Sequence, residues 1–200
     1  MGFDLYGRNP ENVNNVKPPT IDWSKDPSEE ERDKYFEAQD EFRKAVPGDY
    51  FRANVWWWRP IWNFVTEFCD DFLTEKDLAA GNYNDAHFIS KSKAKRIATR
   101  IKQLDKDGTI DGIQKQYNVV AEEAKKHNSK IEKKLNNLRK RVVEATGKKN
   151  IIPADYPSEY RAEWDILTKS KNWSDSYPFD KEFLLEFAEF CKYSGGFEIC

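Results

Sequence analysis

Between residues 113 and 145, positions suited to a helix interface recur at spacings of three and four. Such spacing places them on one face of an α-helix. Roughly 35 helical residues would measure ~50 Å, longer than a compact domain of this size. The pattern predicts a long helix or an antiparallel helical hairpin ending before Gly147, which bends back on itself or packs against a second copy. These positions are Ile113, Tyr117, Val120, Ala124, His127, Ile131, Leu135, Leu138, Val142 and Ala145.

Shorter helices are predicted on both sides of this stripe. Ser28 and Glu31 form a capping-box signature that opens a helix ending near Ala45, before Pro47. The segment Tyr50 to Leu73 reads as one helix, because apolar residues keep helical spacing across Pro60 and predict a bend there. An alternative for this segment makes 55–58 extended and Pro60 the first helical residue. Further helices are expected at 90–106, 159–169 and 180–193.

The two chain ends alternate apolar and polar residues, which indicates short strands. Phe3 and Leu5 flank Asp4, and Phe197 and Ile199 flank Glu198, so the two strands can pair. The expected fold is mainly α: a compact helical domain with a long central helix or helical hairpin and short terminal strands. Residues 1–200 are expected to form a single domain, in which 108–147 protrude and serve oligomerisation.

Charge is unevenly distributed along the 200 residues, although the net charge is only -2. Residues 1–90 carry −8, residues 91–149 carry +11 and residues 150–200 carry −5. The basic middle either pairs internally, is solvated, or faces an anion such as a nucleotide. No stretch approaches the ~20 apolar residues of a membrane span, and three cysteines without a CxxC pair suit reduced thiols. We therefore expect a cytoplasmic protein without a membrane partner.

A stripe of aromatic and cationic residues is the first candidate site. If 50–73 is helical, Arg52, Trp56, Arg59 and Asn63 point the same way, and Trp57 widens the aromatic surface. Guanidinium groups bind phosphate, an indole stacks on a base, and an amide reads a base edge. The alternative is that the rings complete a core or a dimer interface. In that case the arginines pair with nearby acids, such as Glu67, Asp70 or Asp71.

A second polar cluster consists of Tyr83, Asn84, Asp85 and His87. Asp85 and His87 suit an acid–base pair or two metal ligands, but a third ligand and an adjacent nucleophile are missing from the pattern. A surface-loop role for His87 is the alternative, and His127 falls on the long helical stripe, which favours an interfacial role. We therefore expect no catalytic residue, metal or cofactor, and nucleotide-binding motifs such as GxGxxG are absent from the sequence.

The segment 105–116 has some features of a calcium-binding loop. Asp105, Asp107 and Asp111 supply carboxylates, but that motif requires glycine at its sixth position and an acid at its twelfth. Ile110 and Gln116 occupy those positions. Calcium binding is therefore not expected.

Four segments together resemble a family of small proteins from tailed bacteriophages and environmental viral sequences. They are GFDLYG at 2–7, YFRANVWWWRPIW at 50–62, GNYNDAH at 81–87, and FAEFC with SGGFEIC between 187 and 200. The likeness covers the chain in outline and is weakest at 106–150. Some family members carry a CxxC zinc-type insertion, and this chain lacks those cysteines.

A phage origin implies an accessory, host-directed role inside the infected bacterial cell. Small phage proteins of this kind include binders that sequester nucleotide signals of bacterial immunity. By this analogy we expect a homo-oligomer that sequesters a cyclic dinucleotide or a cyclic ADP-ribose-type anion. The alternatives are a protein-interaction module that inhibits a host defence protein, a nucleotide-acting enzyme using Asp85 and His87, and weak nucleic-acid binding by 91–149, which is the less favoured partner.

Overall fold

A computed structural model describes residues 2–12 and 15–200 of the chain. The described residues divide into two compact units. The sheet unit comprises residues up to 114 together with 179–200, and the long-helix unit comprises 115–178. The chain passes from the first unit to the second between residues 114 and 115, inside a long helix, and returns between 178 and 179. The prediction that residues 1–200 form a single domain stays a prediction.

The described residues contain seven α-helices, and a mainly helical protein is therefore confirmed. In chain order the helices and strands are β1 (Gly2–Gly7), α1 (Glu29–Ala45), β2 (Tyr50–Asn54), α2 (Val55–Phe68), α3 (Glu75–Ala80), β3 (His87–Ser90), α4 (Lys91–Lys106), α5 (Thr109–Thr146), α6 (Ser158–Lys169), α7 (Lys181–Tyr193) and β4 (Gly196–Ile199). Three short 3-10 helices are η1 (Trp23–Lys25), η2 (Pro153–Asp155) and η3 (Trp173–Ser176).

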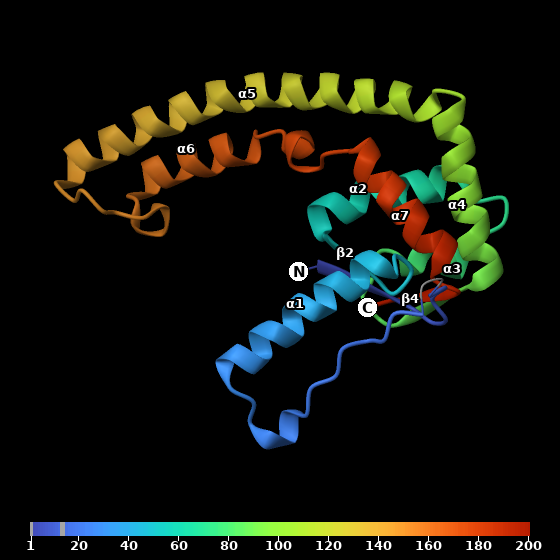
Figure 1. The fold of residues 1–200 in the computed structure, drawn as a ribbon. Coiled ribbons are helices and arrows are strands. Elements are labelled where there is room, and N and C mark those ends of the chain that lie inside the picture. The colour runs from blue at the N-terminus through green and yellow to red at the C-terminus, as the bar shows by residue number, and fades with distance from the viewer. Residues whose placement is uncertain (1, 13–14) are drawn as a thin grey trace. The chain divides into compact units, whose positions relative to one another are not determined.

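The sheet unit is built on a four-stranded antiparallel sheet with the strand order β2-β1-β4-β3. Leu5 of β1 lies opposite Ile199 of β4, so the predicted pairing of the terminal strands is confirmed. The two chain ends therefore lie close together (Figure 1). The edge strands are β2 and β3, which β1 and β4 separate.

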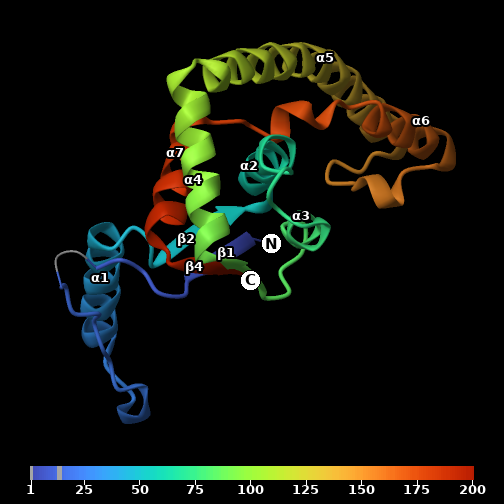
Figure 2. The same ribbon diagram turned by 90° about the vertical axis from the view of Figure 1, so that its right-hand side faces the viewer.

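One face of the sheet is covered by α2, α4 and α7, and α4 packs along α7 (Figure 2). Alternate strand residues point into this layer because successive side chains of a strand face opposite ways. Aromatic rings from strands and helices fill much of the resulting core. The buried residues of this face are Phe3, Leu5, Phe51, Ala53, Ile89, Phe197 and Ile199.

The prediction of a single helix from Tyr50 to Leu73 is wrong. Tyr50–Asn54 is strand β2, paired with β1, and α2 begins only at Val55. The side chain of Asn54 accepts hydrogen bonds from the backbone N–H groups of Trp56 and Trp57, which caps α2 where the strand ends. Pro60 lies inside α2, so the alternative in which Pro60 starts a helix is also wrong.

Most other predicted helices are confirmed. Ser28 caps α1 through the expected capping box with Glu31, and α4, α6 and α7 begin within about two residues of their predicted starts. Two short elements within the segment 75–90, α3 and β3, were not predicted from the sequence.

In the long-helix unit, the stripe forms a single helix rather than a hairpin, and α5 has 38 residues. After α5 the chain turns back and packs against this helix. Leu138 and Val142 of α5 are buried together with Tyr156, and Trp164 of α6 packs against the same cluster. His127 contacts the backbone carbonyl of Ser170 at 2.8 Å, a packing role within the unit.

Candidate functional site

A buried carboxylate, Asp77, organises the region between α3 and β3. Thr74 caps α3 by a capping box: Oδ2 of Asp77 accepts hydrogen bonds from the Thr74 backbone N–H at 2.8 Å and from its hydroxyl at 2.6 Å. In return, the Thr74 hydroxyl accepts from the Asp77 backbone N–H. The first turn of α3 therefore fixes the position of Asp77.

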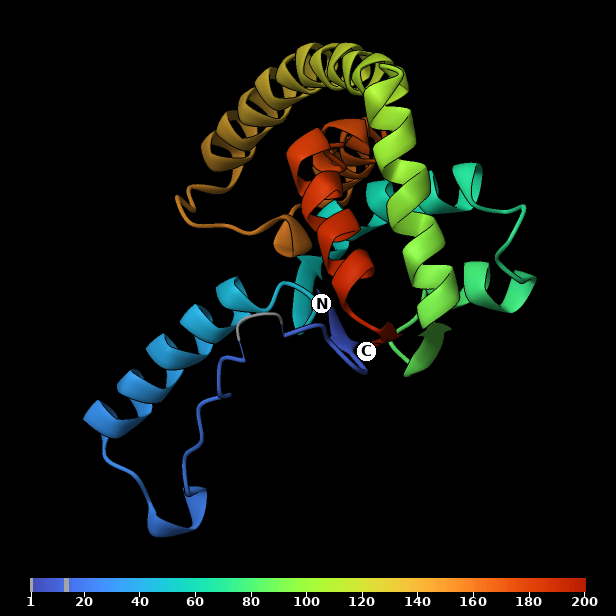
Figure 3. The same cartoon turned by 45° about the vertical axis from the view of Figure 1, so that its right-hand side comes forward.

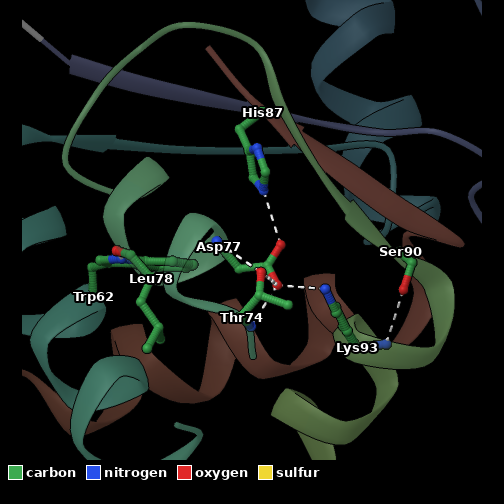
Figure 4. A network of polar contacts seen from close by, with 7 residues as sticks. All are labelled: Trp62, Thr74, Asp77, Leu78, His87, Ser90 and Lys93. Atoms are coloured by element: carbon green, nitrogen blue, oxygen red, sulfur yellow. Dashed lines mark hydrogen bonds and ion pairs between the residues drawn. The ribbon is translucent and has the colours of Figure 1, made fainter. Parts of the chain in front are cut away.

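Two further side chains reach Asp77 from outside α3 (Figure 4). His87, the first residue of β3, places Nε2 2.9 Å from Oδ1. Lys93, in the first turn of α4, forms an ion pair with Oδ2. Because the side chain of Asp77 is only 4% exposed, this network joins α3, β3 and α4 around one buried charge.

The charge of Asp77 persists at neutral pH. Burial by itself raises the pKa of this carboxyl, but hydrogen bonds from Lys93, Thr74 and His87 outweigh that effect and hold the pKa well below its usual range. An ionised carboxylate only accepts hydrogen bonds, so Nε2 of His87 carries the proton in this contact. Asp77 thereby fixes the orientation of the His87 ring.

A cavity of about 520 Å³ lies beside this network, and we call it the α3–β3 cavity. Its walls combine two exposed aromatic rings with a cation, a carboxylate and His87. Tyr83 is 62% exposed and Phe88 is 47% exposed. The lining residues are Lys76, Ala79, Ala80, Tyr83, Asp85, Ala86, His87 and Phe88.

The loop that carries Tyr83 is fastened by indole groups of α2. Trp58 and Trp62 stack with their ring centroids 5.2 Å apart, and both are buried. The Nε1–H of Trp58 donates to the carbonyl of Gly81 at 2.7 Å, and that of Trp62 donates to the carbonyl of Leu78 at 2.8 Å. The tryptophan-rich segment thus supports the cavity from beneath.

The predicted polar cluster 83–87 divides between the cavity and the scaffold. Tyr83, Asp85 and His87 line the cavity. Asn84 instead donates from Nδ2 to the carbonyl of Gly2 at 2.5 Å, which ties the loop to β1. The hydrogen-bond partner of His87 is Asp77 and not Asp85, the acid predicted to pair with this histidine.

The predicted aromatic and cationic stripe holds only in part. Trp56, Arg59 and Asn63 keep helical spacing on α2, but Arg52 lies on β2, so the prediction that all four share one helical face is wrong. The Arg52 guanidinium is 3.5 Å from Asp4 across the β1–β2 pair.

The candidate residues on α2 do not line the α3–β3 cavity. Trp56 is 44% exposed, and Trp57 packs edge-on against Phe183. Nη1 of Arg59 donates to the side-chain oxygen of Asn82 at 2.7 Å, a further brace on the loop. Asp71 was one of the acids predicted to pair with the arginines of the stripe, but it pairs with Arg100 of α4.

The calcium-like segment is occupied by a side chain from α7. Nζ of Lys181 lies 2.7 Å from Asp105 and 2.9 Å from Asp111, while Asp107 accepts from the backbone N–H of Thr109. Within residues 2–12 and 15–200, no group of three or more His, Cys, Asp and Glu side chains is placed to hold a metal ion.

Sequence reasoning missed Thr74, Asp77 and Lys93, which complete the network around His87. One signal was present: Thr74 followed by Asp77 has the spacing of a helix-opening capping box. Nothing in the spacing of Asp77, His87 and Lys93 shows that α3, β3 and α4 meet.

Comparisons with protein-family models, with curated proteins and with solved structures find no match for this chain. The resemblance to tailed-phage proteins therefore stays a hypothesis. Across the described part of the chain, the helices all fall short of the length and apolar character needed to cross a membrane.

Proposed function

We propose that this protein binds a small nucleotide-derived anion in the α3–β3 cavity. The observation that carries the proposal is that two exposed aromatic rings, Tyr83 and Phe88, border the same cavity as Lys76 and His87. Aromatic faces stack on nucleobases, and an ammonium group attracts phosphate as a point charge. The carboxylate of Asp85 adds an acceptor for an amino group of a base.

The size and support of the cavity fit such a ligand. Small-molecule sites enclose about 300 to 1,000 Å³, and this cavity has about 520 Å³. Trp58, Arg59 and Asn84 hold the 81–86 loop through hydrogen bonds, which reduces the ordering cost of binding. Asp77 holds His87 with Nε2 turned inward, so Nδ1 is the ring nitrogen left to meet a ligand.

The proposed biological role is sequestration of a nucleotide immune signal in the cytoplasm of an infected bacterium. The resemblance of four segments to tailed-phage proteins supports this role, and so does the nature of the cavity wall. Cyclic dinucleotides and cyclic ADP-ribose isomers are the ligands to test first, because each joins bases to phosphates. The proposed role needs binding without turnover.

Isothermal titration calorimetry with these nucleotides tests the proposal. Binding should be at least tenfold weaker in Tyr83→Ala and in Lys76→Ala, because stacking on one ring is worth ~1 to 3 kcal/mol and a phosphate loses its cation. Both side chains are exposed, so the fold should survive. Trp56→Ala is the matched control, since Trp56 is an exposed ring outside the cavity wall.

The controls separate the two candidate surfaces. If Trp56→Ala and Arg59→Ala abolish binding while Tyr83→Ala does not, the ligand lies on α2 and the cavity proposal is wrong. Absence of heat with every nucleotide at high protein concentration would remove the nucleotide proposal altogether.

Hydrolysis of a bound phosphoester is a second candidate function, favoured by the Asp77–His87 pair. Nδ1 of His87 can take a proton from water as the water oxygen attacks phosphorus and the P–O bond to the leaving alcohol breaks. The leaving oxygen then takes up that proton. Lys93 is already paired with Asp77 and does not line the cavity, so Lys76 is the one lysine among the lining residues that can contact a phosphate there. We therefore prefer binding. Mass spectrometry of the nucleotide after incubation decides, because an intact nucleotide excludes turnover.

A further inference from the structure

Residues 15–45 form an arm with an exposed aromatic cluster. The arm consists of the segment 15–28, including η1, and helix α1, which lie side by side and extend away from α4 and α7 (Figure 3). None of the 17 residues of α1 is buried. Trp23 of η1 packs against Tyr35 and Phe36 with ring centroids 5.8 and 6.3 Å apart, yet Trp23 is 53% and Phe36 50% exposed.

The base of the arm is anchored, whereas its aromatic end is open. Val46, which follows α1, is fully buried, and the guanidinium of Arg43 lies 4.0 Å from the centroid of the Tyr50 ring. A clustered, exposed set of large rings on an ordered element marks an interaction surface. The arm is therefore suited to cover a partner rather than its own sheet unit.

A complementary groove lies on α4 of the same unit. It encloses about 420 Å³, with the ring of Phe72 beneath the guanidinium of Arg96, 4.1 Å from its centroid. Its charged side chains are all cations. The lining residues are Phe72, Ser92, Lys95, Arg96, Thr99, Arg100 and Gln103.

The charges of the arm and of α4 are opposite. The arm carries a net charge of −3, and the 16 residues of α4 carry +6. The arm leads into the edge strand β2, while α4 leaves the opposite edge strand β3, so arm and groove lie at different edges of the sheet. Within one chain, Lys95 of the groove pairs with Glu11 at 3.1 Å and Arg100 pairs with Asp71 at 3.0 Å, so an incoming arm exchanges these carboxylates for its own.

We propose that two copies of this chain exchange arms, so that the acidic aromatic arm of each copy occupies the basic α4 groove of its partner. Two identical reciprocal contacts close into a symmetric dimer. The rings supply apolar contact with Phe72, and arm carboxylates replace the pairing of Arg96, which lies at the long distance of 3.9 Å from Asp71. This proposal stands apart from the α3–β3 cavity, which shares no residue with the arm or the groove.

A charge-exchange experiment tests the proposal by multi-angle light scattering. The arm variant Asp33→Lys/Glu37→Lys/Asp40→Lys changes the net charge of residues 15–45 from −3 to +3. The groove variant Ser92→Glu/Lys95→Glu/Arg96→Glu changes the charge of the groove residues from +3 to −2. All six side chains are exposed, so both variants should fold.

The wild-type chain should be a dimer with twice the 23.5 kDa chain mass, and its dissociation constant should rise at least tenfold in high salt. Each variant alone should be monomeric, because like charges then face each other. An equimolar mixture should form a heterodimer, because each arm meets an oppositely charged groove in the other variant. That recovery also shows that both variants are folded.

Three results would overturn arm exchange. They are a wild-type chain that is monomeric at about 100 µM, variants that remain dimeric on their own, and a mixture that fails to associate. The first result leaves the arm as a docking surface for a different protein. As an independent check, Trp23→Ala/Phe36→Ala should weaken the dimer at least tenfold, while Ile166→Ala, an exposed apolar residue of α6, should leave it unchanged.

Discussion

Nε2 of His87 lies 2.9 Å from Oδ1 of Asp77, and this contact joins the first residue of β3 to the third residue of α3. Of the two residues, His87 lines the α3–β3 cavity, and Lys93 of α4 forms an ion pair with Asp77. Asp77 therefore has two effects that can be measured separately. It stabilises the packing of three elements, and it orients the histidine that borders the proposed ligand.

Asp77→Asn should lower the free energy of unfolding by about 3 kcal/mol at neutral pH, because it removes the buried carboxylate that accepts from the partly exposed ammonium group of Lys93 and from His87. The pKa of Asp77 is depressed in the folded chain, so ionisation of this residue favours folding. That contribution is complete above the unfolded-state pKa of about 3.9 and disappears as the pH falls toward the lower folded-state pKa. The difference between wild type and variant should therefore be constant above about pH 5 and shrink below about pH 4.

Urea unfolding at a series of pH values measures this difference. Asp85→Asn is the control, since Asp85 is an exposed carboxylate of the same cavity. Its substitution should change stability by less than about 0.5 kcal/mol. A variant of Asp77 that lost no stability at pH 7 would show that Lys93 and His87 find other partners at no cost.

Gly81→Ala should destabilise the chain by about 1 to 3 kcal/mol, because a Cβ atom at this position would lie 1.9 Å from the Trp62 ring. Trp62 cannot move aside easily, since it is only 1% exposed and its indole N–H is bonded to Leu78. The matched control is Gly112→Ala in α5, where a Cβ atom has no neighbour within 4 Å. There alanine should stabilise the helix by up to ~1 kcal/mol. Thermal unfolding by circular dichroism distinguishes the two opposite signs.

The sequence predicted elements whose signals are local. Alternation marks β1 and β4, and the capping box marks α1. The prediction failed at β2 for a physical reason. Phe51, an inward-facing residue of the strand, lies four residues before Val55 of α2, so the apolar spacing of a helix continues through the strand. The pairing of β2 with β1, about fifty positions earlier, overrides that local pattern.

The candidate site shows the same division. His87, Tyr83 and Asp85 could be selected from the sequence because polar and aromatic residues gather in one loop. Asp77 and Lys93 could not, since each reads as an ordinary exposed helix charge until the sheet brings α3 and α4 to the same place. Arg52 was predicted to lie on the helical stripe because residues 50–54 were predicted to be helical, whereas they form strand β2.

Lys181→Ala should lower the melting temperature, and the loss should be greater at low salt than at high salt. Hydrogen bonds with Asp105 and then Asp111 raise the pKa of Lys181, and its removal leaves those two carboxylates facing each other. Lys106→Ala, an exposed lysine at the end of α4, is the control and should have little effect.

Millimolar calcium should leave the wild-type melting temperature unchanged, because the ammonium group of Lys181 already lies between Asp105 and Asp111. A clear calcium-induced rise would contradict this account of the segment.

The three cysteines should differ sharply in reactivity toward a thiol reagent such as DTNB at pH 8. Burial raises the pKa of the Cys69 thiol to about 12 and that of Cys191 well above its ordinary value, and both side chains are inaccessible. The thiolate is the reactive form, so these two groups should stay unmodified until the chain unfolds. Cys200 is partly exposed, and although its pKa is also raised, it should react slowly in the folded protein. We expect one thiol per chain to react without denaturant and all three in urea, and Cys200→Ser should abolish the reaction of the folded chain. Rapid modification of Cys69 in native protein would mean that α2 opens away from the sheet far more readily than its buried tryptophans imply.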